Sequence, residues 1–119
     1  MYKLHIELPG LPRRTNNQFQ HWRAKKAHAD KWKMAVILAI GQNLPPHPLT
    51  KAKLTLIRHS SITPDFDGLV SSFKAAIDGL KYAKVIIDDN MDIIGIPDYR
   101  HVKCKQLKGK IEIIVEQIE

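Results

Sequence analysis

Apolar and polar residues alternate at the start of the chain. From 2 to 8 the even positions are apolar and the odd positions are polar. A period of two is typical of a strand with one buried face, and Pro9-Gly10 predicts its end. Residues 11–26 have no clean period and are rich in proline, arginine and asparagine, which indicates a loop. Apolar residues then recur at helical spacing from Ala29 to Ile40, and Gly41 is placed to end this helix.

The second half of the chain carries strand patterns around a second helix. Residues 51–59 predict a strand, and Asp67 is expected to cap a helix whose apolar stripe extends to about 82. Residues 85–87 form a short β-branched run, which predicts a strand parallel to 51–59 in a βαβ unit. The segments 99–107 and 110–118 predict two final strands joined as a hairpin through Lys108-Gly109.

These elements predict one small domain over 1–119 of the α/β (α+β) class. We expect a mixed β-sheet of about four to five strands with two main helices, in the order β-α-β-α-(β)-β-β. The chain has 119 residues, of which 44% are apolar and 26% are charged. This composition is typical of a single globular domain.

Cysteine content and apolar runs limit the class of protein. A lone Cys104 excludes an internal disulfide and provides too few thiols for a zinc cluster, so we expect a buried core thiol in a reducing compartment. No apolar run approaches the roughly 18 residues of a membrane span. The N-terminus lacks the apolar segment of a signal peptide, which predicts a cytoplasmic location and no membrane partner. The six histidines show no metal-ligand spacing.

The charges are distributed unevenly. The first 60 residues contain eleven Lys or Arg but only two acids, Glu7 and Asp30. The segment 65–92 contains six aspartates and no glutamate. A basic protein with a cluster of short carboxylates suggests a polyanionic partner and a bound cation, which we expect to be a metal ion.

The aspartates are placed to hold such an ion. Asp65 and Asp67 follow one predicted strand, while Asp88 and Asp89 follow its parallel neighbour, so the two pairs are expected to converge at one sheet edge. In an extended stretch the first pair would lie about 6.5 Å apart. Mg²⁺ takes one or two carboxylates together with phosphate oxygens and water, and such an ion assists phosphodiester hydrolysis. Lys74, on a flank of the second helix, is a candidate for stabilising the charged transition state.

A simpler interpretation exists for each of these residues. Asp67 as a helix cap, Asp88 and Asp89 as turn residues, and Lys74 as a surface lysine need no function.

Basic and aromatic residues suggest where nucleic acid would bind. The first loop contains Arg13, Arg14, Arg23, Lys25 and Lys26, and a strand near the C-terminus presents His101, Lys103 and Lys105 on one face. Such groups favour contact with a phosphate backbone, although each one alone is explained as a solvated surface side chain. Trp22 and Phe19 are candidates either for base stacking or for anchoring the loop, whereas Trp32 lies on the apolar stripe of the first helix.

Three segments in a fixed order resemble a known family. They are DFDGL (65–69), FKAAIDGL (73–80) and VIIDD (85–89), and they are preceded by Leu8-Pro9 with Asn16-Asn17 and followed by KGK (108–110). This order and spacing resemble the RusA-type Holliday junction endodeoxyribonucleases, many of which are encoded by phages or prophages. The resemblance covers most of the chain, and for a phage protein it implies a location in the host cytoplasm.

The resemblance implies an activity and a set of site residues. By position, Asp65, Asp67 and Asp89 correspond to the catalytic aspartates, Asp88 to the first member of the later pair, and Lys74 to the catalytic lysine. Asn16 and Asn17 correspond to the DNA-binding loop. The implied function is Mg²⁺-dependent resolution of four-way DNA junctions by a homodimer that makes paired symmetric nicks, with Mn²⁺ as a substitute ion and no organic cofactor.

This chain departs from the family pattern at two points. Gly68 stands where the family has asparagine, and Lys74 lies three residues further from the aspartate pair than in the shortest members. Two other functions stay open on the sequence: a nuclease for flaps or single strands that uses the same carboxylates, and a non-catalytic basic DNA-binding module.

Overall fold

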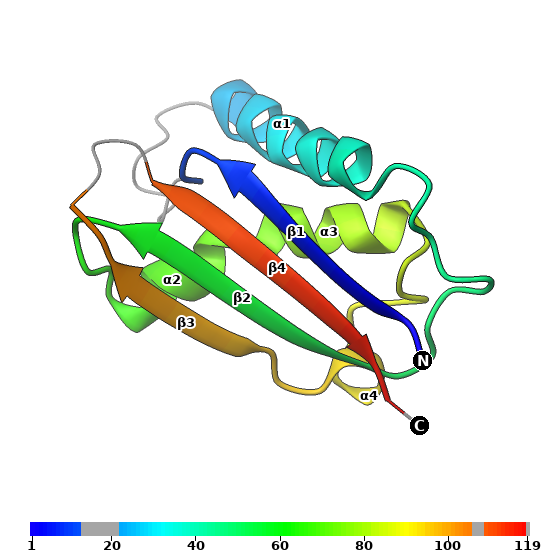
Figure 1. The fold of residues 1–119 in the computed structure, drawn as a ribbon. Helices are drawn as coiled ribbons and strands as arrows, with labels where there is room; N and C mark the ends of the chain where they lie inside the picture. The colour runs from blue at the N-terminus through cyan, green and yellow to red at the C-terminus, as the bar shows by residue number, and fades with distance from the viewer. Residues whose placement is uncertain (13–21, 106–108, 119) are drawn as a thin grey trace.

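A single mixed sheet organises the structure, a computed structural model that describes residues 1–12, 22–105 and 109–118. Its strands are β1 (Lys3–Pro9), β2 (Ala52–Ser60), β3 (Asp98–Lys103) and β4 (Lys110–Gln117), in the spatial order β1-β4-β2-β3 (Figure 1). β4 is antiparallel to both β1 and β2, and β3 is parallel to β2. The predicted fold class, with a mixed sheet of four strands, is confirmed.

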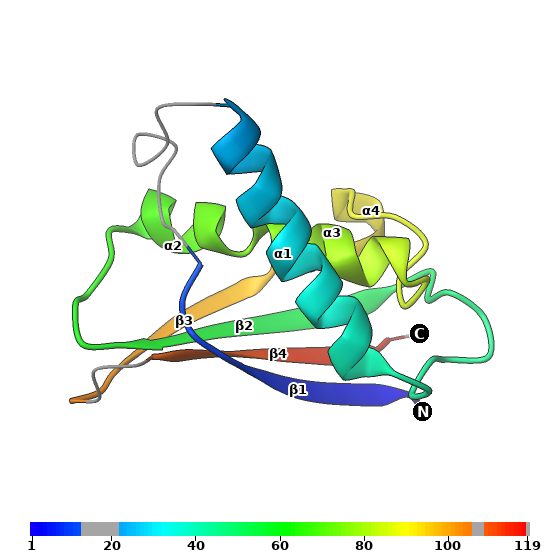
Figure 2. The ribbon, with the colours of Figure 1, turned by 90° about the horizontal axis from the view of Figure 1, so that it is seen from above.

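The helices cover one face of this sheet and leave the other open (Figure 2). They are α1 (Trp22–Ile40), α2 (Phe66–Ser72), α3 (Lys74–Tyr82) and α4 (Met91–Ile94). The alternation predicted for the first strand explains this, because its even positions are buried and its odd positions are exposed. β4 and β2 present isoleucine, valine and leucine to the same side. Among the described residues, no helix is long and apolar enough to cross a membrane.

α1 and α3 pack closely enough that one position needs glycine. Trp32, Val36 and Ile40 of α1 are buried against the sheet and α3. A Cβ built on Gly79 of α3 would lie 3.0 Å from both the Lys33 carbonyl oxygen and the Val36 Cβ. The absence of a side chain at Gly79 therefore sets how closely the two helices approach.

α1 begins earlier than the sequence pattern predicts. Residues 22–26, expected in the loop, form the first turns of the helix. Its end is as predicted, since Gly41 adopts a positive φ of 55° and its N–H bonds back to the Ile37 carbonyl.

The predicted C-terminal hairpin is wrong, because β3 pairs with β2 and not with β4. The physical reason is the difference in burial between the two strands. Ile111, Ile113 and Val115 of β4 are fully buried, which suits a central strand, whereas no residue of β3 is fully buried and this strand occupies an edge. Cys104 follows β3 and is partly exposed, so the expectation of a buried core thiol is also wrong. The predicted linker residue Lys108 lies outside the described residues.

The segment 85–87 is not a sheet strand. It makes one isolated parallel bridge, between Ile86 and Leu49. Val85 and Ile86 are nevertheless buried in the core, so hydrophobic burial and not strand pairing explains this apolar run. The parallel neighbour of β2 is β3, and the crossover between them is longer than expected.

Replacing Gly79 by alanine tests the packing of α1 on α3. Helix propensity alone predicts that Gly79→Ala stabilises the protein by about 1 kcal/mol. The contacts at 3.0 Å predict the opposite, because the added methyl must push two helices apart, at a cost of about 1–3 kcal/mol. Urea unfolding of the two proteins decides between the effects, and a stabilised variant would contradict the packing described here.

Candidate active site

All the predicted acidic site residues lie on the crossover that joins β2 to β3. This connection carries α2, α3 and α4 on the helix-covered face of the sheet (Figure 1). Parallel strands require such a connection, and functional groups in these folds gather where the chain leaves the sheet.

The first aspartate of the pair shapes the start of α2. Asp65 has an extended backbone (φ −71°, ψ 166°), and its Oδ1 accepts a 2.8 Å hydrogen bond from the Gly68 N–H. Asp65 is therefore the N-cap, and the prediction that Asp67 caps this helix is wrong. Asp67 lies in the first turn, and both carboxylates are exposed. Gly68 contributes through its backbone, so this bond does not require the family's asparagine.

The predicted second helix is broken at Phe73, and the break places Lys74 at the start of α3. The hydroxyls of Ser71 and Ser72 donate to the carbonyls of residues 68 and 69, three positions earlier. Such bonds compete with the helical ladder and bend helices. Phe73 at the break (φ −99°, ψ 0°) is fully buried. Its burial fixes the position from which the exposed Lys74 projects.

Lys74 and Asp89 line one pocket. This pocket has a volume of about 310 Å³ and is bordered by the end of α2, the first turns of α3, and the segment from Asp89 to Tyr99. Lys74 and Asp89 are the charged side chains among the described residues that line it. The structure thus places two predicted site residues, 15 positions apart in the sequence, on the wall of one pocket.

Tyr99 links this pocket to the aspartate pair. Its ring lines the pocket and packs edge-on against Phe66, with 6.3 Å between the ring centroids. The same ring is tilted against that of the buried Phe73, with 6.1 Å between the centroids. Phe66 lies between Asp65 and Asp67 in the chain, so the contact ties the start of α2 to the pocket wall. Partial burial raises the pKa of the Tyr99 hydroxyl.

The two later aspartates differ in environment. Asp88 Oδ1 accepts the Asp89 N–H at 2.8 Å and lies 3.0 Å from Lys81 Nζ, while Oδ2 accepts from the Asn90 side chain. The hydrogen bond from the Asp89 N–H, with the one from Lys81, lowers the pKa of Asp88 to about 2. Asp88 therefore holds its own turn. Asp89 lines the pocket, and its Oδ1 lies 3.7 Å from the same Lys81 Nζ.

The four aspartates do not converge in the way the sequence predicted. Within 1–12, 22–105 and 109–118, one group of three possible metal ligands has its ligand atoms within 4.8 Å of one another, and it consists of His5, Glu7 and Glu112. In the same described residues, Asp65, Asp67 and Asp89 do not form such a group. The sequence placed Asp88 and Asp89 at the end of a strand next to β2, and this was wrong because 85–87 is not a strand of the sheet. Mg²⁺ needs only one or two carboxylates beside water and phosphate oxygens, so such an ion would not require all the aspartates to converge.

The predicted DNA-binding residues fall into three groups. Arg23, Lys25 and Lys26 are exposed on the first turns of α1, where Lys26 pairs with Asp30 at 2.7 Å. Lys103 and Lys105 are exposed at the end of β3 and just beyond it. The other four predicted DNA-binding residues lie outside the described residues, and they are Arg13, Arg14, Asn16 and Asn17. Phe19 also lies outside them.

The predicted aromatic and imidazole groups also have defined places. Trp22 is 67% exposed, and the Arg23 guanidinium lies 5.4 Å from its ring centroid. His101 is half-buried, and its Nε2 lies 2.8 Å from the Ser60 hydroxyl.

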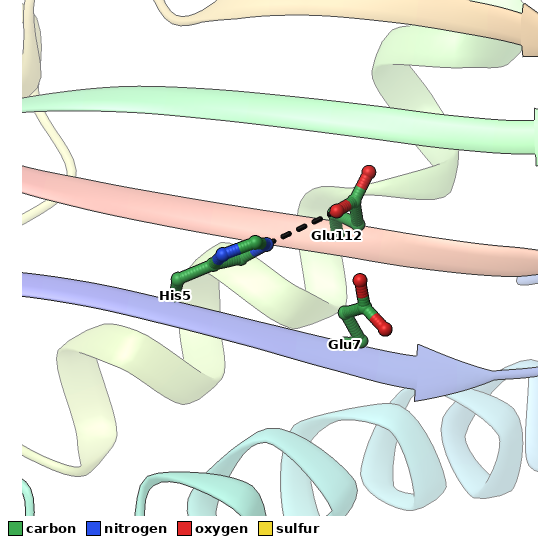
Figure 3. Close-up of side chains that lie close together, drawn as sticks. All are labelled: His5, Glu7 and Glu112. Carbon is green, nitrogen blue, oxygen red and sulfur yellow. Dashed lines mark hydrogen bonds and ion pairs between the residues drawn. The ribbon is translucent and has the colours of Figure 1, made fainter.

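Sequence reasoning missed a second cluster, on the open face of the sheet. His5 and Glu7 of β1 lie beside Glu112 of β4 (Figure 3). The alternation of residues 2–8 already placed His5 and Glu7 on the outer face. Their partner comes from the other end of the chain, so only the register of β1 on β4 reveals the group.

No family model matches this chain, and no curated protein matches it.

The pKa of Asp88 makes a prediction about stability. Because this pKa lies below its ordinary value of 3.8, the ionised carboxylate stabilises the fold above that pH, and the contribution is lost as the pH falls through about 2. We expect Asp88→Asn to unfold at a lower urea concentration than the wild type at pH 7. The difference should close between about pH 4 and pH 2.

Asp92→Asn is the matched control in the same segment, because among the described residues Asp92 forms no ion pair. Asp92→Asn should unfold at nearly the same urea concentration as the wild type at pH 7. An Asp88→Asn protein as stable as the wild type at that pH would contradict the role assigned to this turn.

Proposed function

We propose that this protein is a Mg²⁺-dependent endodeoxyribonuclease of the RusA type that resolves four-way DNA junctions. The observation that carries the proposal is the pocket shared by Lys74 and Asp89, coupled through Tyr99 and Phe66 to the start of α2. Residues that the family resemblance selects from three separate segments thus lie on one crossover and are linked through one pocket wall.

Each side chain has a role that follows from its position. Asp89 and the exposed Asp67 are the carboxylates available to a metal ion. Asp65 accepts the cap hydrogen bond through Oδ1, so its Oδ2 could also bind the ion. Mg²⁺, when bound, would activate a water molecule and neutralise charge on the scissile phosphate. The Lys74 ammonium, in the same pocket as Asp89, stabilises the negative charge that develops on the phosphate oxygens. Asp88 holds the turn that presents Asp89.

The charge distribution supports a polyanion on the helix side. α1 contains five Lys or Arg and one Asp. On the open face, by contrast, basic side chains have acidic partners: Lys3 with Glu116, Lys110 with Glu7, and Arg100 with Asp98. Unbalanced positive charge is what attracts a phosphate backbone, and on the helix side it lies on α1, beside the aspartates of the crossover.

A dimer would match the symmetry of the substrate. A four-way junction has approximate two-fold symmetry, and its resolution requires a nick at two equivalent phosphates. A C2 dimer with one site in each protomer meets this requirement directly. We therefore include a homodimer in the proposal.

Metal-dependent cleavage of a synthetic junction tests this function. Purified protein is incubated with a labelled four-way junction whose arms cannot migrate, in Mg²⁺ or in EDTA. We expect paired symmetric nicks in Mg²⁺ only. Asp67→Asn and Asp89→Asn should each lower the cleavage rate by at least about 100-fold, since loss of a metal's outer partners alone costs about 10–100-fold. Junction binding should be retained in both variants.

Asp92→Asn removes a carboxylate from the same connection and should cleave at the wild-type rate. Preferred cleavage of flap or single-stranded substrates would assign the same carboxylates to a different nuclease. Binding without cleavage in every divalent metal would favour the non-catalytic module, for which the capping role of Asp65 and the turn role of Asp88 provide a structural reason.

The basic start of α1 predicts a salt dependence. A triple variant in which glutamine replaces Arg23, Lys25 and Lys26 should flatten the plot of log affinity against the log of the salt concentration. The slope should fall by about 0.9 for each DNA phosphate that these side chains neutralise in the wild type. Fluorescence anisotropy on a labelled junction at several salt concentrations measures this slope.

A double variant, Lys3→Gln with Lys53→Gln, removes charges from the open sheet face as the control. Its slope should equal that of the wild type. An equal reduction of the slope in both variants would contradict binding through α1.

A further inference from the structure

The open face of the sheet carries a compact group of imidazoles and carboxylates. β1 and β4 pair with Glu7 directly opposite Glu112, and β2 pairs with β4 on the other side. His5 Nε2 lies 3.0 Å from Glu112 Oε1, and His59 Nε2 lies 2.5 Å from Glu112 Oε2 (Figure 3 shows His5, Glu7 and Glu112). Glu112 is thus held between one imidazole from each neighbouring strand.

The arrangement places like charges together. Two carboxylates directly opposite each other on adjacent strands repel, and such pairs destabilise a sheet. The side chain of Glu112 is only 15% exposed, so water screens it poorly. Lys110 Nζ lies 3.5 Å from Glu7, and the imidazoles of His59 and His5 bond to Glu112, so each carboxylate already has at least one partner that offsets this repulsion. A divalent cation between Glu7 and Glu112 would attract both carboxylates at once.

The donor atoms select the kind of cation. His5 Nε2 and one oxygen each from Glu7 and Glu112 lie within 4.8 Å of one another. Around a tetrahedral Zn²⁺ ion, with bonds of about 2.0–2.2 Å, ligand atoms lie about 3.3 Å apart. The 3.0 Å between His5 and Glu112 is close to that spacing. Imidazole favours Zn²⁺ over Mg²⁺, which prefers oxygen ligands only.

We propose that His5, Glu7 and Glu112 form a Zn²⁺ site on the open face of the sheet, with a water molecule as the fourth ligand. His59 is a positioning residue, because it bonds the second oxygen of Glu112 and so orients the first toward the ion. The ion would join β1 to β4 and stabilise their pairing. The site lies on the sheet face opposite the proposed nuclease site and does not depend on that function.

The test uses tag-free protein stripped of metal by a chelator. It is titrated with Zn²⁺ against a chromophoric competitor, in the presence of excess Mg²⁺. We expect one equivalent of Zn²⁺ to bind and to raise the melting temperature. His5→Gln and Glu112→Gln should each weaken binding by at least about 100-fold, and His59→Gln by about tenfold, as expected for a residue outside the ligand set.

Three control variants show whether the loss of Zn²⁺ binding is specific to this cluster. His47→Gln and Glu116→Gln, which remove an imidazole and a carboxylate outside the cluster, should bind as the wild type does. Asp67→Asn should also bind normally, which separates this site from the aspartates of the crossover. Circular dichroism checks that every variant is folded. With Co²⁺ in place of Zn²⁺, the visible absorption bands of a tetrahedral ion should appear in the wild type and be lost in His5→Gln.

The opposite results are equally specific. If no stoichiometric binding occurs, or if His5→Gln and Glu112→Gln bind as tightly as the wild type, the cluster is a set of hydrogen-bonded charge pairs and the proposal fails. Junction cleavage by the His5→Gln protein reports separately on the nuclease, so failure of one proposal does not imply failure of the other.

Discussion

The central position of β4 is the constraint on which the rest of this structure depends. β4 is the last strand in the sequence, yet it lies between β1 and β2 and pairs with both. Its inner residues, Ile111, Ile113 and Val115, are fully buried and form the middle of the core. The register that buries these three side chains also fixes what lies outside, because residues alternate between the two faces of a strand. Core packing and the Glu112 cluster therefore have one cause.

With β4 between β1 and β2, the edge of β2 remains open and β3 occupies it in the parallel direction. A parallel neighbour cannot be reached by a tight turn, so a long connection is required. That connection carries α2, α3 and α4 and all the aspartates that the sequence singles out. It is anchored by aromatic packing, since Tyr99 of β3 contacts Phe66 and the buried Phe73. The site residues are thus presented from helix ends and turns on a fixed support.

The sequence predicted what local periodicity encodes. The alternation of residues 2–8, the apolar stripe of α1 and the Gly41 terminus follow from patterns within one element. The errors concern contacts between elements. Nothing within 85–87 distinguishes a sheet strand from a buried turn with one bridge to Leu49. Likewise, the closeness of 99–107 and 110–118 in sequence favoured a hairpin, although the burial of β4 required two partners for that strand.

The same distinction applies to the candidate site. Lys74 and the aspartates could be selected from residue type and order, but the role of each depends on neighbours that spacing does not give. Asp65 and not Asp67 caps α2, because the backbone at Asp65 is extended where the helix begins. Lys81 lies near both later aspartates, and Asp88 differs from Asp89 because its carboxylate also accepts the Asp89 N–H and the Asn90 side chain. The break at Phe73 follows two serines whose hydroxyls bond back along the helix.

We propose different cations for the two faces of the sheet, and the reason is their side-chain chemistry. The crossover offers short aspartates beside a lysine, a set that suits a hard ion with exchangeable water and phosphate ligands. The open face offers His5, Glu7 and Glu112, a mixed set that suits zinc. Between them lies the apolar layer of Leu54, Leu56 and the inner side of β4, all fully buried. Because this layer is apolar and closely packed, a change in one set should act on the other only through the stability of the sheet they share.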